Sequence, residues 1–240
     1  MEQKIRELNR IVKNGKRMVF FGGAGVSTES GIPDFRSQDG LYSQNYAYPP
    51  EQILSGTFFE RHTEEFFAFY RDKMIVQDAQ PNAAHLKLTE LEQAGKLNAV
   101  ITQNIDGLHQ KAGNRNVFEL HGSVHRNFCR KCGKSYSLEI VFSAVGVPLC
   151  ECGGIIKPDV VLYEESLDHQ VIEGAIEAIR KADILIIGGT SLVVYPAAGF
   201  VNYFTGEELV IINKSSTAMD SKANLVIAES IAMVMSQIIL

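Results

Sequence analysis

The stretch MVFFGGAGVSTESGIPDFR, residues 18–36, joins a predicted buried strand to a glycine-rich loop. It begins with a continuous apolar run, MVFFGG (18–23), which is typical of a strand buried on both faces of a sheet. The glycines of GAG (23–25) let the backbone approach a ligand closely, and the amide groups of the next turn can hold a phosphate. A tight structural turn explains such a pair of glycines equally well, because Thr28 stands where a dinucleotide-binding fingerprint has its third glycine.

The rest of the chain alternates short apolar runs with amphipathic segments. The apolar runs predict further strands at 98–102 (NAVIT), 184–189 (ILIIGG) and 208–213 (ELVIIN). Helical spacing of apolar residues predicts helices over 1–14, 81–95, 168–183 and the last fourteen residues. Strands that are apolar throughout and alternate with helices predict a parallel sheet covered on both faces. Ligands bind such sheets beyond the carboxyl ends of the strands.

Two segments interrupt this alternation. One is an aromatic-rich stretch at 33–80, and the other, at 125–157, contains all four cysteines. They predict a smaller domain inserted into a larger α/β domain, which then comprises residues 1–32, 81–124 and 158–240. For most of the Phe residues in the first segment we expect ordinary core packing.

The cysteines form two pairs, Cys129-x-x-Cys132 and Cys150-x-Cys152, with 17 residues between the pairs. Paired thiolates at this separation predict a tetrahedral four-cysteine zinc site, although the second pair has one intervening residue instead of two. Because four thiolates leave no open coordination position, we expect the ion to be structural. His121 is then not needed as a metal ligand.

Composition and charge exclude several functions. A net charge of −5 disfavours binding to nucleic acid, and no uninterrupted apolar run is long enough to span a membrane. The N-terminal segment is charged throughout, unlike a signal peptide. A cytoplasmic location follows by default, and in such a reducing compartment the four cysteines are unlikely to form disulfide bonds. We therefore expect a cytoplasmic protein with no nucleic-acid or membrane partner and, because neither end carries a long extension, a monomer.

Seven motifs, in sequence order, resemble those of the sirtuin family of NAD-dependent protein deacylases. The resemblance covers nearly the whole chain and is to the compact bacterial and archaeal members. The motifs are GAGVSTESGIPDFR (23–36), TQNIDGLHQKAG (102–113), ELHGS (119–123), the two cysteine pairs, KPDVVLYEESL (157–167), GTSLVVYPA (189–197) and IN (212–213).

The resemblance implies an α/β fold with two domains. A Rossmann-like parallel sheet covered by helices binds NAD, and a smaller inserted domain holds a zinc ribbon and a helical part. It also implies an enzyme that uses NAD as a cosubstrate, carries one structural Zn²⁺ ion and acts on acetylated lysine peptides or proteins. The acetyl group passes to ADP-ribose, so that nicotinamide and O-acetyl-ADP-ribose are released.

The resemblance further assigns individual residues to the site. His121 is the catalytic base, and Asn104 and Asp106 belong to the nicotinamide and ribose pocket. NAD is also contacted by a mobile cofactor loop, by the QNID motif and by segments near its phosphates and adenosine: Gly23, Ala24, Gly25, Ser27, Thr28, Asp34, Phe35, Arg36, Gln103, Asn104, Ile105, Asp106, His121, Gly189, Thr190, Ser191, Asn213 and Lys214. The peptide is expected to add as a strand against Val160, Leu162, Tyr163, Glu164, Val193 and Val194.

The sirtuin reaction explains why the family has a histidine at this position. After nicotinamide leaves C1′ of its ribose, the acetyl-lysine oxygen attacks that carbon and gives an alkylimidate. A base must then help a ribose hydroxyl attack the imidate, and an imidazole with a pKa near neutrality can do so. We expect Gly122, the next residue, to leave space for the ribose. Ordinary structural roles are expected for His62, His85, His109, His125 and His169.

Three positions depart from the usual sirtuin pattern. Gly22 stands where many members have threonine, and Ser37 where glycine often follows DFR. Glu164 stands where the family usually has the glycine of Phe-Gly-Glu. If that position needs a positive φ angle, a glutamate is strained there, which predicts an altered peptide-binding loop.

The helix after the cofactor loop predicts which acyl groups are accepted. Members that prefer succinyl or malonyl groups carry Tyr-x-x-Arg there, where this chain has Phe67 to Tyr70. Without that arginine a charged acyl group would be unpaired in an apolar pocket, which is unfavourable. We therefore expect acetyl and longer uncharged acyl groups to be preferred.

Two other functions compete with the deacylase. A protein mono-ADP-ribosyltransferase would use NAD with a different acceptor, and an NAD-responsive binding module would catalyse nothing. The retained His121, Val160 and 189–197 segment favour the deacylase, and a binding module predicts loss of the base or of QNID. A dehydrogenase is disfavoured because the glycine loop departs from the usual fingerprint.

Overall fold

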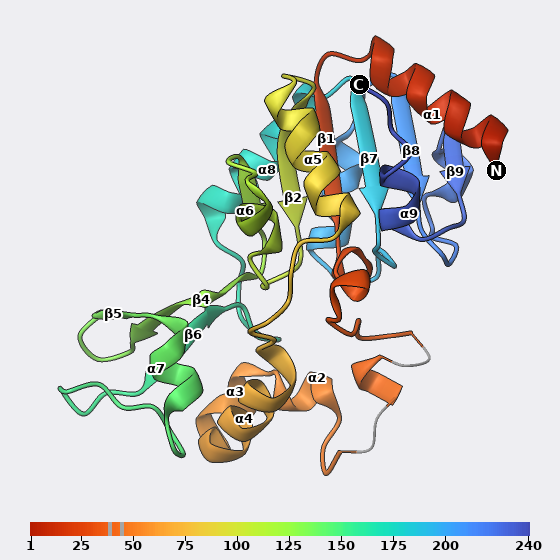
Figure 1. Ribbon diagram of the computed structural model, residues 1–240. Coiled ribbons are helices and arrows are strands. Elements are labelled where there is room, and N and C mark those ends of the chain that lie inside the picture. Colours follow the sequence, from red (N-terminus) through yellow and green to blue (C-terminus); the bar gives the residue numbers. More distant parts are fainter. Residues whose placement is uncertain (38–39, 44–45) are drawn as a thin grey trace.

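The computed structural model describes residues 1–37, 40–43 and 46–240, whose elements form a larger and a smaller part (Figure 1). The larger part is built on a six-stranded sheet in the order β3-β2-β1-β7-β8-β9, and all its neighbouring strands are parallel. Strands β1 to β3 follow one another towards one edge of the sheet, and β7 to β9 follow one another towards the other edge. The direction in which strands are added therefore reverses between β1 and β7, and such sheets bind ligands at this point. The strands are β1 Met18–Gly22, β2 Leu97–Thr102, β3 Val117–Glu119, β7 Ile184–Gly188, β8 Glu208–Ile212 and β9 Leu225–Ile227.

Helices cover both faces of this sheet, as predicted (Figure 1). Alternate residues of each strand face opposite layers, so Phe20 lies in the core of one face and Phe21 in that of the other. Both side chains are fully buried, which explains why the strands are apolar throughout. One face packs against α1 Glu2–Asn14, α5 Ala83–Gln93 and α9 Ile231–Met235, and α6 Leu108–Ala112 lies beside α5. The other face packs against α8 His169–Lys181 and the 3-10 helix η5 Ala197–Tyr203.

Two helix starts are fixed by polar side chains. Asp168 accepts hydrogen bonds from two amides in the first turn of α8, as its sequence position predicts. At the start of α5, the Asn82 side chain accepts from the Ala84 amide, and the Asn82 amide donates to Nδ1 of His85. His85 therefore has the structural role expected of it.

The smaller part combines a second sheet with short helices. Its antiparallel strands, in the order β5-β4-β6, are β4 Gly122–Cys129, β5 Ser135–Tyr136 and β6 Ile156–Val160. Its helices are α2 Pro50–Ile53, α3 Gly56–Arg61, α4 Thr63–Phe69 and α7 Leu138–Ser143, with a π-helical turn at Tyr70–Met74. A third core joins them and contains most of the Phe residues of 33–80. Because Val124, Val160 and Leu162 also belong to this core, the domain boundaries given above stay a prediction.

The edges of the large sheet and the C-terminal segment differ from the sequence-based expectation. The edge strands β3 and β9 are not predicted, since each is three residues long and too short to show a pattern. The last fourteen residues are not one helix. β9 extends to Ile227, and the Ser230 hydroxyl accepts from the Met233 amide, so that α9 begins late and covers five residues.

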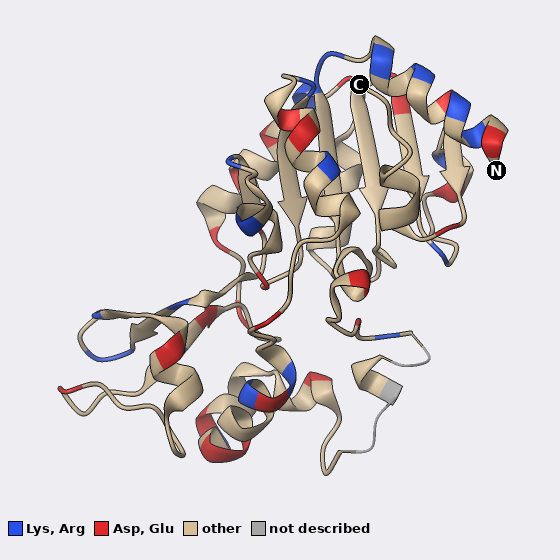
Figure 2. Ribbon diagram, viewed as in Figure 1, with Lys and Arg blue, Asp and Glu red and all other residues tan. Residues whose placement is uncertain are grey.

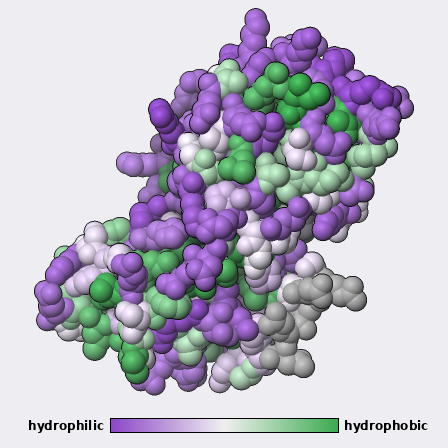
Figure 3. Space-filling view, viewed as in Figure 1, coloured by the Kyte–Doolittle hydropathy of each residue, from purple (hydrophilic) through white to green (hydrophobic). Residues whose placement is uncertain are grey.

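The surface mixes charges and carries several apolar areas. Figure 2 shows acidic and basic residues interleaved along α1, where Arg6 pairs with Glu2 at 3.5 Å and Arg10 with Glu7 at 2.7 Å. Figure 3 shows hydrophobic surface at the end of the smaller part that carries the second sheet and α7. The exposed apolar residues of that region are Phe128, Ile140, Phe142, Val145 and Leu149. In the described part of the chain, no helix is long and apolar enough to cross a membrane.

Candidate active site

A large cleft separates the carboxyl ends of the sheet strands from the smaller part. Its volume is about 1270 Å³, and residues of both parts line it. All of the catalytic, cofactor-binding and peptide-binding residues predicted from the sequence line this cleft except Val193. Val193 is 54% exposed, whereas Val194, next to it, belongs to the lining.

Two glycine turns meet at the floor of the cleft, after β1 and β7. The Gly25 amide donates to the carbonyl of Gly189 at 2.8 Å, and a Cβ on Gly25 would lie 2.8 Å from the Gly189 Cα. Gly189 has a φ of 59°, and a Cβ there would lie 2.4 Å from the Val26 nitrogen. The missing side chains therefore make room for the neighbouring backbone, as in a tight structural turn, and both glycines also line the cleft.

His121 lies between β3 and β4, and one hydrogen bond fixes its ring. Its Nδ1 is 3.0 Å from the carbonyl oxygen of Gln103. A carbonyl oxygen only accepts, so Nδ1 carries the proton and Nε2 keeps its lone pair. Burial lowers the pKa of His121, and the bond to Gln103 partly opposes this shift. The residue thus contributes a neutral imidazole to the cleft, with Nε2 able to accept a proton.

Gln103 also joins the ends of three strands. Its amide donates to the carbonyl of Gly22, the last residue of β1, at 3.0 Å. Its side-chain Nε2 donates to the hydroxyl of Thr190, just beyond β7, at 3.1 Å. The position of the His121 ring is therefore set by the same residue that holds the β1 and β7 turns together.

Ser27 brings two predicted residues into one cluster. Its hydroxyl donates to Oδ2 of Asp106 at 2.6 Å and accepts from Nδ2 of Asn104 at 3.0 Å. The other oxygen of Asp106 accepts from the Leu108 amide at 2.9 Å. Ser27 and Asn104 are buried, so this cluster forms a fixed polar wall of the cleft.

The cofactor loop that follows β1 is held by its own side chains. Oδ1 of Asp34 accepts from the amides of Arg36 at 3.1 Å and Ser37 at 2.7 Å, which turns the chain. The rings of Phe35 and Tyr42 pack edge to face, with centroids 5.6 Å apart. The Arg36 guanidinium lies 5.1 Å from the centroid of the same Tyr42 ring. Arg36 is exposed in the cleft and can meet an anionic group.

The departure at Glu164 has a structural explanation. Glu164 has a φ of 76°, so the position does require the conformation that glycine adopts without strain. Its carboxylate accepts a hydrogen bond from the Thr57 amide at 2.8 Å, and hydrogen bonding to Thr57 lowers the pKa of Glu164. Glu164 therefore alters this loop by forming a hydrogen bond to the start of α3.

Gly122 does not leave space for a ligand. Its φ is 75°, and a Cβ there would lie 1.9 Å from the carbonyl oxygen of Asp159 on the paired strand β6. The expectation that this glycine makes room for a ribose is wrong, because the backbone of β6 fills that space.

The four predicted metal ligands converge. Their Sγ atoms all lie within 4.8 Å of one another, with 3.5 Å between Cys129 and Cys152 and 3.6 Å between Cys132 and Cys150. A disulfide would bring two sulfurs to about 2.0 Å, whereas four thiolates around one Zn²⁺ stand about 3.8 Å apart. The cluster therefore fits one tetrahedral zinc ion.

Several cleft residues are not predicted from the sequence. His125, expected to be an ordinary structural histidine, lines the cleft, and its Nε2 is 3.1 Å from the Asp106 carbonyl oxygen. Glu29 bonds the hydroxyl of Ser230 at the start of α9 and lines the cleft with it. The ELHGS neighbourhood could have indicated His125, but Ser230 comes from a segment with no recognisable motif.

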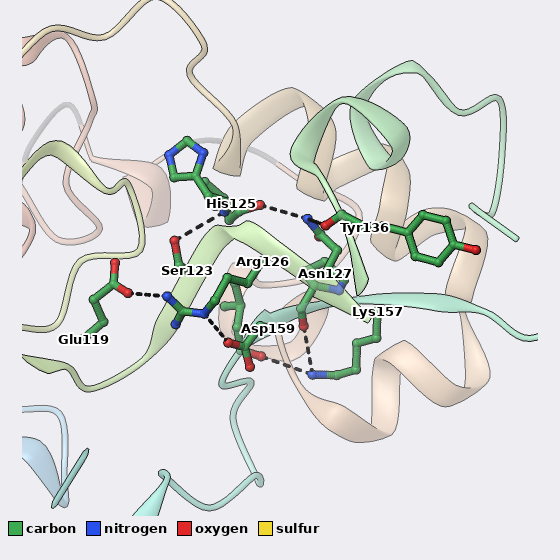
Figure 4. A network of polar contacts seen from close by, with 11 residues as sticks. Glu119, Ser123, His125, Arg126, Asn127, Tyr136, Lys157 and Asp159 are labelled. Carbon is green, nitrogen blue, oxygen red and sulfur yellow. Dashed lines mark hydrogen bonds and ion pairs between the residues drawn. The ribbon is translucent and has the colours of Figure 1, made fainter. Parts of the chain in front are cut away.

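An ion-pair network links the two sheets beside the cleft (Figure 4). Arg126 of β4 contacts Glu119 of β3 at 2.6 Å and Asp159 of β6 at 2.7 Å. The Lys157 ammonium donates to the Val160 carbonyl at 3.1 Å on the same strand. Arg126 thus joins the last strand before His121 to the antiparallel sheet.

Comparison with known proteins identifies the family. The family model described as Sir2 family matches residues 23–196. The chain belongs to the Sir2 family. A Clostridium acetobutylicum protein named NAD-dependent protein deacetylase is 61% identical over 240 residues, which covers 98% of each chain. The family and the fold class predicted from the sequence are therefore confirmed.

Solved Sir2 structures share this fold. A Sir2 variant with deacetylated p53 peptide and 3′-O-acetyl ADP ribose superposes with a TM-score of 0.91 at 36% identity, over 97% of this chain and 96% of that one. A Sir2 complex with a p53 peptide and NAD⁺ gives a TM-score of 0.86 at 38% identity, over 96% and 95%. These Sir2 proteins bind the cosubstrate and the product of the reaction that the sequence motifs imply.

Proposed function

We propose that the chain is an NAD-dependent protein lysine deacetylase. It transfers the acetyl group of acetyl-lysine to ADP-ribose and releases nicotinamide and O-acetyl-ADP-ribose. The observation that carries this proposal is His121, whose Nδ1 is held as a donor to the Gln103 carbonyl while Nε2 remains a base in the cleft. The names of its Sir2 relatives agree with this activity.

His121 acts as the general base. NAD supplies the ADP-ribosyl group that accepts the acetyl group, and the base takes a proton from a ribose hydroxyl at Nε2. The Gln103 carbonyl then stabilises the imidazolium, because it accepts a hydrogen bond from Nδ1 in both charge states. The lowered pKa of His121 keeps it unprotonated at neutral pH, ready for this step.

NAD is held by the two turns and the polar cluster. The nicotinamide and its ribose face Ser27, Asn104 and Asp106, whose mutual hydrogen bonds orient the amide and the carboxylate. The phosphates lie near the β1 and β7 turns, where backbone amides and Arg36 supply positive charge. The adenosine half reaches the segment beyond β8 that contains Asn213 and Lys214, both of which line the cleft.

The acetylated peptide lies across the mouth of the cleft as an added strand between 160–164 and 192–194. Beside His121 the wall is apolar and contains Ile105, Val124 and Val160, which suits the acyl chain. Phe67 and Tyr70 are fully buried, and Arg71, next along the chain, donates to the Val141 carbonyl. Because this wall is apolar and no arginine stands at Phe67 to Tyr70, we expect acetyl and longer uncharged acyl groups to be preferred.

The zinc ion is structural and would hold the end of β4 and the turn after it to the turn before β6. The Tyr136 hydroxyl donates to Sγ of Cys150 at 3.0 Å and, as the main cause, lowers the pKa of that thiol to about 6. A thiolate is the form that binds zinc. Because these thiols must stay reduced, we place the protein in the cytoplasm.

Mass spectrometry of an acetyl-lysine peptide, with and without NAD, tests the function. We expect the peptide to lose its acetyl group only with NAD, and nicotinamide and O-acetyl-ADP-ribose to appear together. His121→Tyr should abolish this product, whereas His169→Tyr, a change at an exposed histidine of α8, should not. An unchanged acetyl group with ADP-ribose attached to the peptide or the protein would instead show a mono-ADP-ribosyltransferase.

A further inference from the structure

The turn at 162–165 meets the cofactor loop through a pair of phenols. The hydroxyls of Tyr163 and Tyr42 are 2.8 Å apart, although the two residues are 121 positions apart in the chain. Tyr163 lies in the peptide-binding turn, where the sirtuin pattern usually has the phenylalanine of Phe-Gly-Glu. A phenylalanine would lack the hydroxyl that makes this contact.

The Tyr163 side is fastened to the smaller part. Its amide donates to the carbonyl of Leu54 and its carbonyl accepts from the amide of Gly56, both at 2.9 Å. The next residue, Glu164, adds the bond from its carboxylate to the Thr57 amide. These three bonds hold the backbone on both sides of Tyr163 against the start of α3.

The Tyr42 side is fastened to the cofactor loop. Its amide donates to the carbonyl of Phe35 at 2.9 Å, its ring packs against that of Phe35, and Arg36 lies over the same ring. Burial, and then the bond to Tyr163, raise the pKa of Tyr42, so its hydroxyl stays protonated. The two residues that the loop presents to NAD therefore pack directly on the residue that Tyr163 holds.

We propose that Tyr163 is a positioning residue that couples the peptide site to the cofactor loop through its hydroxyl bond to Tyr42. The proposal rests on the proposed deacetylase function. A peptide bound as an added strand fixes the turn, and the phenol pair extends that constraint to Phe35 and Arg36. A bound peptide thereby lowers the conformational cost of holding the loop around NAD. By linkage, bound NAD favours the peptide by the same factor.

Tyr163→Phe tests the coupling because it removes only the hydroxyl. The affinity of the purified protein for ADP-ribose is measured by calorimetry with and without saturating acetyl-lysine peptide, since this pair cannot turn over. We expect the peptide to tighten ADP-ribose binding in the wild type and Tyr163→Phe to reduce that effect roughly two- to tenfold, the worth of one neutral hydrogen bond. Tyr42→Phe should match it, and the double variant should be no worse than either.

A tyrosine outside the cleft provides the control. Tyr203 is 41% exposed and packs against Arg180, so Tyr203→Phe should keep the full effect of the peptide. In steady-state assays at saturating peptide, Tyr163→Phe should raise the KM for NAD by a larger factor than it lowers kcat, a split that a general loss of folded protein would not give.

The outcomes separate this proposal from the function on which it rests. If the wild type removes acetyl groups but the peptide tightens ADP-ribose binding equally in wild type and Tyr163→Phe, or not at all in the wild type, the coupling is wrong and the function stands. Additive losses in the double variant would also overturn it, because the two hydroxyls would then act separately. If the wild type removes no acetyl group with NAD, the deacetylase function fails, and the coupling fails with it.

Discussion

Replacing Arg126 with methionine should destabilise the protein mainly by leaving Glu119 without its partner. The Glu119 side chain is 8% exposed, whereas Arg126 is 46% and Asp159 43% exposed. Removing the partner of a buried carboxylate costs about 1–3 kcal/mol, while a half-exposed pair such as the one with Asp159 contributes about 0.2–1 kcal/mol. We therefore expect Arg126→Met to lower the free energy of unfolding by about 2 kcal/mol, with most of the loss arising at Glu119.

Urea unfolding followed by far-UV circular dichroism measures this loss, since the chain has no tryptophan to report by fluorescence. Asp159→Asn, which breaks only the exposed half of the network, should cost less than about 1 kcal/mol. Adding Glu119→Gln to Arg126→Met should recover at least half of the stability, because the unpaired charge is then gone. Equal losses for Arg126→Met and Asp159→Asn, or no recovery in the double variant, would refute the argument that the buried carboxylate dominates.

Three further predictions follow from the packing and the charges. With zinc about 1,000-fold above its dissociation constant, zinc binding adds ~4 kcal/mol to the free energy of unfolding. A chelator should therefore lower the melting temperature by roughly 10 °C, and added zinc should restore it. Burial lowers the pKa of His85 to about 4 and that of His109 well below its usual value. On acidification the unfolded chain therefore binds protons before the folded one, so the free energy of unfolding, complete above pH 6.5, should fall towards pH 4 by about 3 kcal/mol for His85. A urea midpoint that stays constant from pH 7 to 5 would contradict this. Gly122→Ala should cost more than Gly146→Ala in unfolding free energy, since both have positive φ but only the first Cβ would strike Asp159; similar losses would mean that backbone strain alone matters.

The sequence predicts the central sheet well, because a strand that is buried on both faces is apolar at every position. β1, β7 and β8 are continuous apolar runs, and the structure places them as adjacent parallel strands. β3 and β9 escape prediction because a three-residue edge strand is defined by its partner's hydrogen bonds and not by a pattern of its own. The zinc ligands are predictable for a similar reason, since the spacing of the cysteines is itself the chemical constraint.

Gly122 shows where sequence reasoning about the site fails. It stands in a recognised motif, where space for a ligand is the natural explanation, but the structure uses it to admit the Asp159 carbonyl. Gly25 lines the cleft, and its missing side chain also lets its turn pack against Gly189. Both are contacts between segments distant in the chain, which no local pattern contains. Glu164 is the converse case, because the sequence predicts strain there but cannot supply the Thr57 amide that offsets it.

Gln103 fixes the position of the His121 base relative to the turns after β1 and β7. Its carbonyl orients His121, its amide holds Gly22, and its side chain holds Thr190. If His121 were fixed only by its own strand, small movements of the smaller part would displace Nε2, because β4 begins directly after it and leads into that part. Since the orienting carbonyl belongs to the end of the large sheet instead, Nε2 keeps its position relative to the β1 and β7 turns.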